Sequence, residues 1–392
     1  MKLVRTFHPV GHGAFYTERF YDEHDKNVAN IVFDCGCHEA CKPGKSIADF
    51  QKQIDDIVDC EFPLNEVEKI TIDALFISHF HTDHINGIPR LLNNCNVKRI
   101  IMPKLTDDVL LDVFLYTMFV HEFSAKDAYD AIDGFMKDAE GLTVEVEINE
   151  EDINDNVEFE ETNIDDIGIP ISKPTIIKVL SRWKYIPFST KEKKAQLKQA
   201  LINGVPELSA ALSVSPIDLK QIADEFTNKP DLVGKCRKVY DSCFGNNNQH
   251  NRYSMTLFSG TCDKFTTCSH RCHQGVVELP RYCTKNCLYM GDFEADPTKS
   301  LKNTNCEQLL KFYERYWSKI GMFQVPHHGS RDNTNVKLYS PPKFGIISAG
   351  KDDVYLNPHI DVIHLLQRHN CVPLIVTDDP TTIQKFYYKI CI

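Results

Sequence analysis

Hydrophobic and polar residues follow two different periods along the chain, and the changes of period divide it into three parts. In the first part, short runs of β-branched and aromatic residues predict strands at Lys2–Phe7, Ala14–Thr17, Val28–Phe33, Ala74–Ile77 and Val97–Met102. In the second part, apolar residues at helical spacing predict helices at Asp107–Phe123, Ala125–Lys137, Lys191–Ile202, Pro216–Phe226 and Asp231–Ser242. In the third part, strands are predicted at Ser254–Phe258, Leu288–Met290, Phe323–Pro326, Phe344–Ser348 and Pro373–Val376, with a helix at Ile360–Arg368.

These patterns predict an α/β core that is interrupted by a mostly helical insertion. We assign residues 1–104 and 246–392 to the core and residues 105–245 to the insertion. An inserted element of this kind is expected to act as a lid or as a packing element over a site, or to offer a surface to a protein partner.

Composition indicates an ordinary globular protein. The chain has 392 residues, of which 42% are hydrophobic and 25% are charged. The N-terminus lacks the apolar stretch of a secretory signal, and no run approaches the roughly 20 apolar residues of a membrane span. We therefore expect a cytoplasmic protein that does not contact membranes.

The net charge of −11 disfavours broad, sequence-independent wrapping of nucleic acid. It does not exclude a phosphodiester substrate, because a pair of metal ions can hold a phosphate without a basic protein surface.

One short segment concentrates metal-binding residue types. The mostly apolar run Leu75–Ser78 leads directly into His79, His81, Asp83 and His84. Imidazole and carboxylate groups are ligands for zinc, manganese and iron, and four of them within six residues can converge on one cavity where a strand turns into a helix. The alternative is a polar turn whose histidines are solvated.

The pattern His-x-His-x-Asp-His resembles the signature of the metallo-β-lactamase superfamily. That resemblance implies a four-layer αββα sandwich with two metal ions at the sheet edges. Three further segments resemble motifs of the same family: the strand that ends in Asp34, the strand that ends in Gly291-Asp292, and the segment from Pro326 through His327 and His328 to Ser330.

More local features resemble the hydrolase domain of bacterial competence DNA-uptake channels of the ComEC type. They are Val10-Gly11-His12-Gly13-Ala14, Asn251-x-x-Ser254, and Ser348-Ala349-Gly350 followed by Asn357-Pro358-His359. The resemblance covers about the first hundred and the last hundred and fifty residues, and it does not cover the insertion. His12 departs from the motif, which usually has Gln there.

The resemblance implies a role for each motif residue. One divalent ion, Zn or Mn, is expected on His79 and His81, and the second on Asp83, His84 and His327, with Asp292 bridging the two and Asp34 supporting the metal loop. We expect Asp83, His328 and His359 to take part in catalysis, with His359 protonating the leaving group or contacting phosphate. The alternative for His359 is a residue that only begins a helix.

His250 is a further candidate ligand. Many superfamily members supply a third histidine to the first metal near this point of the chain, and His250 directly precedes Asn251. The alternative is an exposed histidine in a polar loop.

The 15 cysteines are expected to be reduced thiols or metal ligands in a cytoplasmic chain of this size. Cys268, Cys272, Cys283 and Cys287 form two Cys-x3-Cys pairs that could hold one additional structural zinc ion. Free buried thiols are the alternative.

The resemblance favours a phosphodiesterase or nuclease that uses a hydroxide activated by two metal ions, with nucleic acid or a nucleotide as its substrate. Hydrolysis of a small molecule such as a lactone, thioester or β-lactam is an alternative, since one fold hosts many reactions. A metal-binding sensor or partner protein of a bacterial defence system, acting through the helical insertion, is a third hypothesis.

Overall fold

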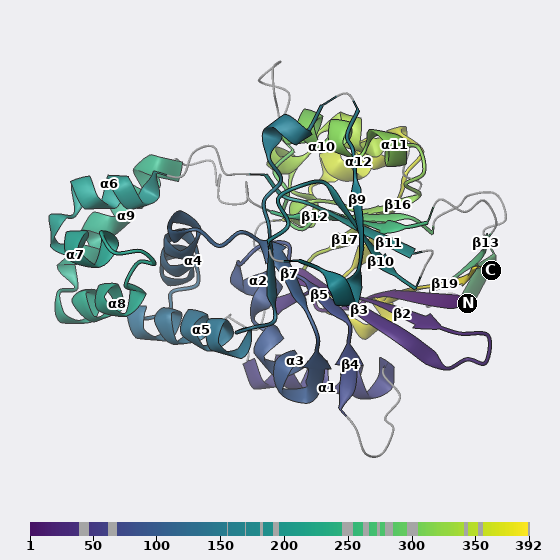
Figure 1. Ribbon diagram of the computed structural model, residues 1–392, viewed down its shortest axis with the longest axis horizontal. Coiled ribbons are helices and arrows are strands. Elements are labelled where there is room, and N and C mark those ends of the chain that lie inside the picture. The colour runs from purple at the N-terminus through teal and green to yellow at the C-terminus, as the bar shows by residue number, and fades with distance from the viewer. Residues whose placement is uncertain are drawn as a thin grey trace.

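Two β-sheets packed face to face form the centre of the protein (Figure 1). The computed structural model describes residues 1–38, 47–61, 69–154, 156–168, 170–180, 183–190, 196–244, 254–261, 266–272, 275–278, 285–295, 305–340, 344–351 and 356–390. Within these ranges, no helix is long and apolar enough to cross a membrane.

The first sheet is antiparallel in one half and parallel in the other. In spatial order its strands are β14 (Gly275–Glu278), β13 (Thr266–Cys272), β19 (Gln384–Ile390), β1 (Lys2–Phe7), β2 (Gly13–Tyr21), β3 (Asn27–Cys37), β5 (Ala74–Phe76), β7 (Ile100–Pro103) and β8 (Thr143–Val146). Neighbouring strands are antiparallel from β14 to β3 and parallel from β3 to β8. The small sheet of β4 (Ile70–Ile72) and β6 (Cys95–Val97) is separate.

The second sheet is also mixed. In spatial order its strands are β18 (Val372–Val376), β17 (Phe344–Ser348), β16 (Met322–Gln324), β15 (Cys287–Tyr289), β12 (Thr256–Gly260), β11 (Trp183–Phe188), β10 (Thr175–Val179) and β9 (Glu160–Asn163). Neighbours are parallel from β18 to β15, antiparallel from β15 to β10, and parallel again between β10 and β9.

Helices cover the outer face of each sheet, so the predicted four-layer α/β sandwich is confirmed (Figure 1). Helices α1 (Ile47–Glu61) and α3 (Ile88–Asn94) lie on the first sheet, and α10 (Asn305–Phe312), α11 (Glu314–Trp317) and α12 (Ile360–Arg368) lie on the second. Alternation along a strand explains the layers, because successive side chains of a strand point to opposite faces.

Strand β3 illustrates this alternation. Ile31 and Phe33 belong to the core between the sheets, whereas Val32 belongs to the core under the outer helices. A strand buried on both faces therefore reads as a nearly continuous apolar run.

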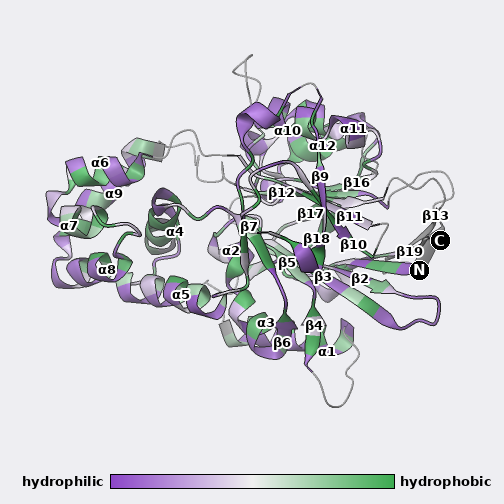
Figure 2. Ribbon diagram, in the orientation of Figure 1, coloured by the Kyte–Doolittle hydropathy of each residue, from purple (hydrophilic) through white to green (hydrophobic). Residues whose placement is uncertain are grey.

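Helices α4 to α9 form a lobe at one side of the sandwich, which we call the helical lobe (Figure 1). It consists of α4 (Asp107–Val120), α5 (Ala125–Asp138), α6 (Leu197–Gly204), α7 (Ser209–Leu212), α8 (Leu219–Asn228) and α9 (Asp231–Phe244). Thr106 and Ser124 cap α4 and α5 by accepting hydrogen bonds from main-chain N–H groups of the first turn. Figure 2 shows hydrophobic and hydrophilic residues on the same helices, as expected for helices that bury one face.

The structure divides the chain differently from the predicted insertion at 105–245. Strands β8 to β11 lie within that range and join the two core sheets, so the helical lobe is built from two separate segments of chain. Tyr240 joins these segments by donating a hydrogen bond of 2.7 Å to Asp112. Strands β10 and β11 are short and largely buried, and a short apolar run has no periodicity that separates it from a buried helix. Strands β8 and β9 have only four residues each, and β9 is polar and mostly exposed, so neither gives a clear strand signal.

Short 3-10 turns complete the described structure, and several border the site below. They are η2 (Glu150–Asp152), η3 (Ile164–Asp166), η4 (Pro206–Leu208), η7 (His327–Gly329), η8 (Arg331–Asn333), η9 (Val336–Tyr339) and η10 (Pro380–Thr382).

Candidate metal centre

The motif after β5 forms a tight corner that ends in the short helix α2 (Thr82–Ile85). Strand β3 passes directly beneath this helix. A Cβ atom on Gly36 would lie 2.3 Å from the carbonyl carbon of Asp83 and 2.4 Å from the main-chain nitrogen of His84. The glycine of the Asp34-Cys35-Gly36 segment is therefore required for α2 to sit at the sheet edge.

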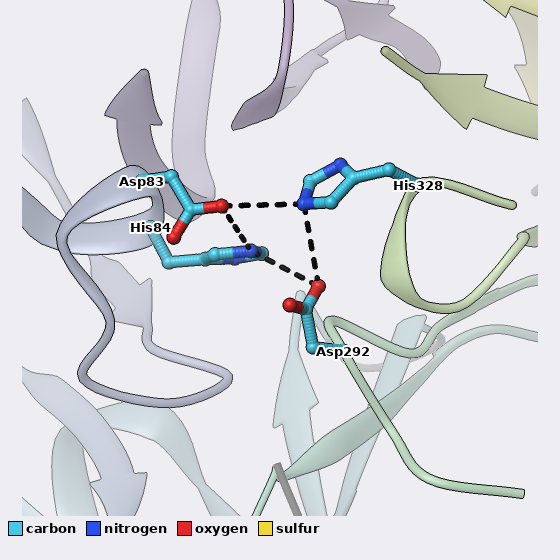
Figure 3. A group of neighbouring side chains, drawn as sticks. All are labelled: Asp83, His84, Asp292 and His328. Carbon is cyan, nitrogen blue, oxygen red and sulfur yellow. Dashed lines mark ion pairs between the residues drawn. The ribbon is translucent and has the colours of Figure 1, made fainter. Parts of the chain in front are cut away.

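Four buried side chains from three parts of the chain converge beside α2 (Figure 3). We call this group, Asp83, His84, Asp292 and His328, the second cluster. His84 Nε2 lies 3.2 Å from Asp292 Oδ1 and 3.8 Å from Asp83 Oδ2. His328 Nε2 lies 3.3 Å from Asp83 Oδ2 and 3.5 Å from Asp292 Oδ1.

A first cluster lies on the other side of Asp292. It consists of His79, His81 and Asp292, whose ligand atoms lie within 4.8 Å of one another. Asp292 Oδ2 is 3.7 Å from His79 Nε2, whereas Oδ1 faces the second cluster. The two oxygens of one carboxylate thus serve two adjacent groups of potential ligands.

The two adjacent histidines at the end of β16 point to different clusters. His328 lies in the second cluster, where its Nδ1 is 2.8 Å from the carbonyl oxygen of Ser348. His327 Nε2 lies 3.7 Å from Asp292 Oδ2, the oxygen that faces the first cluster, and its Nδ1 contacts Asn333.

The structure therefore differs from the expectation that His327 would join Asp83 and His84. His327 and His328 both have positive φ angles, 49° and 54°, so the chain turns in the left-handed region at two consecutive residues. Which imidazole enters a cluster depends on this turn, and the order of residues does not reveal it.

Asp34 lies directly under the metal corner. It accepts hydrogen bonds from the main-chain N–H of Ser78 at 2.6 Å and the hydroxyl of Ser78 at 2.7 Å, and its Oδ2 is 2.8 Å from Nδ1 of His84. Burial raises the pKa of the Asp34 carboxyl above its ordinary value. Asp34 thus orients His84 and takes no place in either cluster.

The carboxylates of Asp83 and Asp292 are buried, and burying negative charge is unfavourable unless positive charge lies close to it. Burial alone would raise the pKa of Asp83, but His84, His328 and His12 hold it well below its usual range. Asp292 behaves in the same way: burial opposes ionisation, while His327, His84 and His328 hold its pKa well below the usual range.

The imidazole nitrogens of the two clusters also favour a bound cation. The Nε2 atoms of His79, His84 and His328 are buried and make no hydrogen bond of regular geometry within the described ranges. Buried polar atoms are ordinarily satisfied, and a cation would satisfy these nitrogens and the carboxylates together. Imidazole nitrogen and carboxylate oxygen are the donor set of zinc and manganese, so the residues fit a pair of divalent ions.

Comparison with known proteins agrees with this geometry. Residues 29–143, which include the metal corner, match the family model described as the metallo-beta-lactamase superfamily. The chain has the metallo-β-lactamase fold, and the matched segment carries the metal-binding motif of the superfamily. The protein is a metallo-β-lactamase-fold hydrolase with a buried His/Asp cluster suited to metal.

Other similarities are partial or distant. ComE operon protein 3 of Bacillus subtilis (strain 168) is 42% identical over 71 residues, which are 18% of this chain and 9% of that protein. Zn(2+)-bound PqqB from Methylobacterium extorquens is 7% identical, with 95% of this chain and 97% of that chain covered and a TM-score of 0.37. Isothiocyanate hydrolase from Delia radicum gut bacteria is 10% identical, with coverage of 96% and 97% and a TM-score of 0.34.

His359 lies beside the second cluster at the start of α12. Its main-chain N–H donates to the carbonyl oxygen of Gly329 at 3.1 Å, and its side chain is 37% exposed. Nδ1 caps the helix by accepting a hydrogen bond of 3.2 Å from the N–H of Asp361. His359 thus caps the start of α12, which agrees with the alternative role given to it from the sequence. Its Nε2 atom is the one that could contact a substrate.

Other candidate residues fall outside the described structure. His250 and Cys283 lie there, and only the backbone of Cys268 and Cys272 is described, on β13. Cys287 lies in the core on β15, where burial raises its thiol pKa to about 12. The zinc clip and the third histidine therefore remain predictions.

Four further side chains near the clusters were assigned no role from the sequence. Their rings form a continuous series from the first cluster to the second. The ring of Tyr116 stacks on His81 at 3.9 Å between centroids and 2° between planes. The series continues through His121 at 5.4 Å, His38 at 5.2 Å and His12 at 5.3 Å.

The series ends at the second cluster, where the rings of His12 and His328 are 3.8 Å apart. We call Tyr116, His121, His38 and His12 the ring series. These residues come from separate loops and from the end of α4, so no local sequence motif unites them. Only His12, inside a glycine-rich motif, carried a sequence signal.

Proposed function

We propose that the protein is a metal-dependent phosphodiesterase that acts on nucleic acid or on a nucleotide. The shared carboxylate of Asp292 carries this proposal, because its two oxygens face two ligand clusters. Two divalent ions that share a carboxylate are suited to stabilise both the attacking and the leaving oxygen of an in-line displacement at phosphorus.

Each of the two clusters would hold one of the two ions. His79, His81 and Asp292 would hold one ion, with His327 beside them, and the second cluster would hold the other. A bound pair of zinc or manganese ions supplies positive charge to the phosphoryl oxygens and lowers the pKa of a water molecule in the site. The protein keeps the ligands buried and fixed, so little reorganisation accompanies the reaction.

His359 is proposed to donate a hydrogen bond to the leaving-group oxygen while keeping its own proton. Its Nδ1 accepts the cap hydrogen bond, so the neutral ring carries its proton on Nε2. Its main chain is tied to Gly329, next to His328, which keeps it near the second cluster.

The motif resemblance supports the choice of a phosphodiester among hydrolysable bonds. The motifs around His12, His327 and His359 resemble those of the hydrolase domain of competence DNA-uptake proteins. The acidic net charge is compatible with such a substrate if binding is local to the metal centre and does not rely on a basic surface.

Hydrolysis of bis-p-nitrophenyl phosphate and of labelled single-stranded and duplex DNA tests the proposal directly. Protein loaded with Zn²⁺ or Mn²⁺ is compared with Asp83→Asn and Asp292→Asn, and with Asp165→Asn as an exposed control. We expect both site variants to lose at least about 100-fold in rate and the control to retain it. Turnover of a lactone or thioester without turnover of any phosphodiester would refute the proposal.

A further inference from the structure

The helical lobe reaches the metal centre through the end of α4. Tyr116 lies in the last turns of this helix and stacks on His81, while His121 is the residue that ends it. The stacked rings hold the end of α4 against the first cluster. The lobe therefore borders the site directly, and its contribution can be traced to individual side chains.

His121 has a polar atom with no assigned partner. Its Nε2 is buried and makes no hydrogen bond within the described ranges, the same property that marks the Nε2 atoms of His79, His84 and His328. Buried polar atoms without partners are uncommon in folded proteins and call for a functional explanation.

The surroundings of His121 make it a neutral hydrogen-bonding group. Burial lowers its pKa to about 4; Asp83 acts in the opposite direction, while His38 and His12 lower the pKa further. Near pH 7 the ring therefore has one N–H donor and one acceptor. It belongs to neither group of ligand atoms within 4.8 Å of one another, so the geometry does not make it a ligand.

We propose that His121 is a substrate-contact residue whose Nε2–H donates a hydrogen bond to an oxygen of the phosphodiester held at the metal centre. This inference rests on the proposed phosphodiesterase function. It gives the helical lobe a part in recognising the substrate, through a side chain that lies beside Tyr116, whose ring stacks on His81 of the first cluster. A neutral donor fits this task because it adds a hydrogen bond without competing with the ions for the carboxylates.

Two variants of His121 separate its hydrogen bond from its bulk. His121→Phe keeps an aromatic ring in the ring series and removes both nitrogens, whereas His121→Gln retains an N–H donor. His369→Phe is the matched control, because His369 also ends a helix, is also half-buried, and lies against Tyr339, far along the chain from the metal corner.

Three quantities are measured on each metal-loaded protein: bound metal by mass spectrometry, affinity for inorganic phosphate by calorimetry, and kcat/KM for bis-p-nitrophenyl phosphate. For His121→Phe we expect phosphate affinity and kcat/KM to fall by about 10- to 100-fold, the range for one hydrogen bond to a charged group. Metal content should not change. His121→Gln should recover most of the loss, and His369→Phe should match the wild type.

Equal phosphate affinity and kcat/KM in His121→Phe and His369→Phe would overturn this inference and leave the phosphodiesterase proposal intact. Loss of metal in His121→Phe would also overturn it, because the residue would then act on the ions. A wild-type protein that binds metal but neither binds phosphate nor cleaves any phosphodiester would refute the proposed function, and this inference with it.

Discussion

The carboxylate of Asp34 lies 2.8 Å from Nδ1 of His84. Because Asp34 also accepts two hydrogen bonds from Ser78, its oxygens can serve only as acceptors, and the proton of His84 is held on Nδ1. Nε2 of His84 is thereby left to face Asp292 and the second cluster. An acidic residue that belongs to neither cluster thus determines which nitrogen of His84 is available to a metal ion.

Asp34→Asn should weaken metal binding by about 10- to 100-fold while leaving the fold intact. Asparagine tolerates the positive φ of 52° at this position, but its amide N–H₂ would face Nδ1 of His84 and favour the wrong tautomer. Competition with a fluorescent chelator measures the affinity. Asp73→Asn is the control, because Asp73 accepts a hydrogen bond from Asn30 away from the clusters. Equal affinity in both variants would contradict this role of Asp34.

The adjacent histidines of η7 should have separable effects on metal content. His328→Ala removes a member of the second cluster, so we expect the protein to retain one tightly bound ion after dialysis. His327→Ala should keep the ion held by Asp83 and His84, because His327 faces the other oxygen of Asp292. Mass spectrometry gives the stoichiometry, and anomalous diffraction locates the remaining ion. Loss of the second-cluster ion in His327→Ala and not in His328→Ala would reverse the assignment.

The sequence predicts best where the ligands are local. His79, His81, Asp83 and His84 share one corner after a strand, so their spacing alone brings them together. Asp292 lies far along the chain, and its place in the site followed only from resemblance to a known family. The four-layer architecture likewise followed from the resemblance, because hydrophobic periodicity alone predicted only an α/β core with an insertion.

The features that could not be predicted depend on tertiary contacts. Consecutive positive φ angles decide which of His327 and His328 enters the second cluster. Histidine adopts positive φ angles more often than most residues, but the sequence does not show that both positions do so here. Tyr116 and His121 have the spacing of an ordinary helix and its end, and only the packing of α4 brings them to the metal centre.

A buried ion pair between the sheets should be important for stability. Arg5 Nε lies 2.7 Å from Glu18 Oε1, and both side chains are buried. Hydroxyl groups of Tyr289 and Ser259 also donate to Glu18. Glu18→Gln leaves the buried guanidinium without its counter-charge, so we expect the free energy of unfolding to fall by about 3–5 kcal/mol.

Urea denaturation measures this effect, and a double-mutant cycle with Arg5→Met isolates the pair. The double variant should be less destabilised than the sum of the two single variants, because it leaves no unpaired charge. Lys173→Ala, which breaks the exposed pair with Glu160, should change stability little. Additive effects of the two core substitutions would show that Arg5 and Glu18 act independently.

Acid should destabilise the metal-free protein partly through His8. This side chain is fully buried against Phe15, and burial lowers its pKa from an ordinary 6.5 to about 3. Between these values the unfolded chain binds a proton that the folded protein does not, so the free energy of unfolding falls as the pH decreases from 6.5 towards 3.

At pH 5 this difference amounts to about 2 kcal/mol relative to pH 7. His8→Phe keeps a ring against Phe15 and removes the titrating group, so its stability should decline less steeply over the same interval. Urea unfolding at several pH values, with EDTA present to keep metal binding out of the comparison, gives both slopes. His24→Phe, on an exposed turn, should retain the slope of the wild type. Parallel pH profiles for the wild type and His8→Phe would mean that His8 becomes protonated without unfolding, which requires water or a carboxylate such as Glu61 to reach its ring.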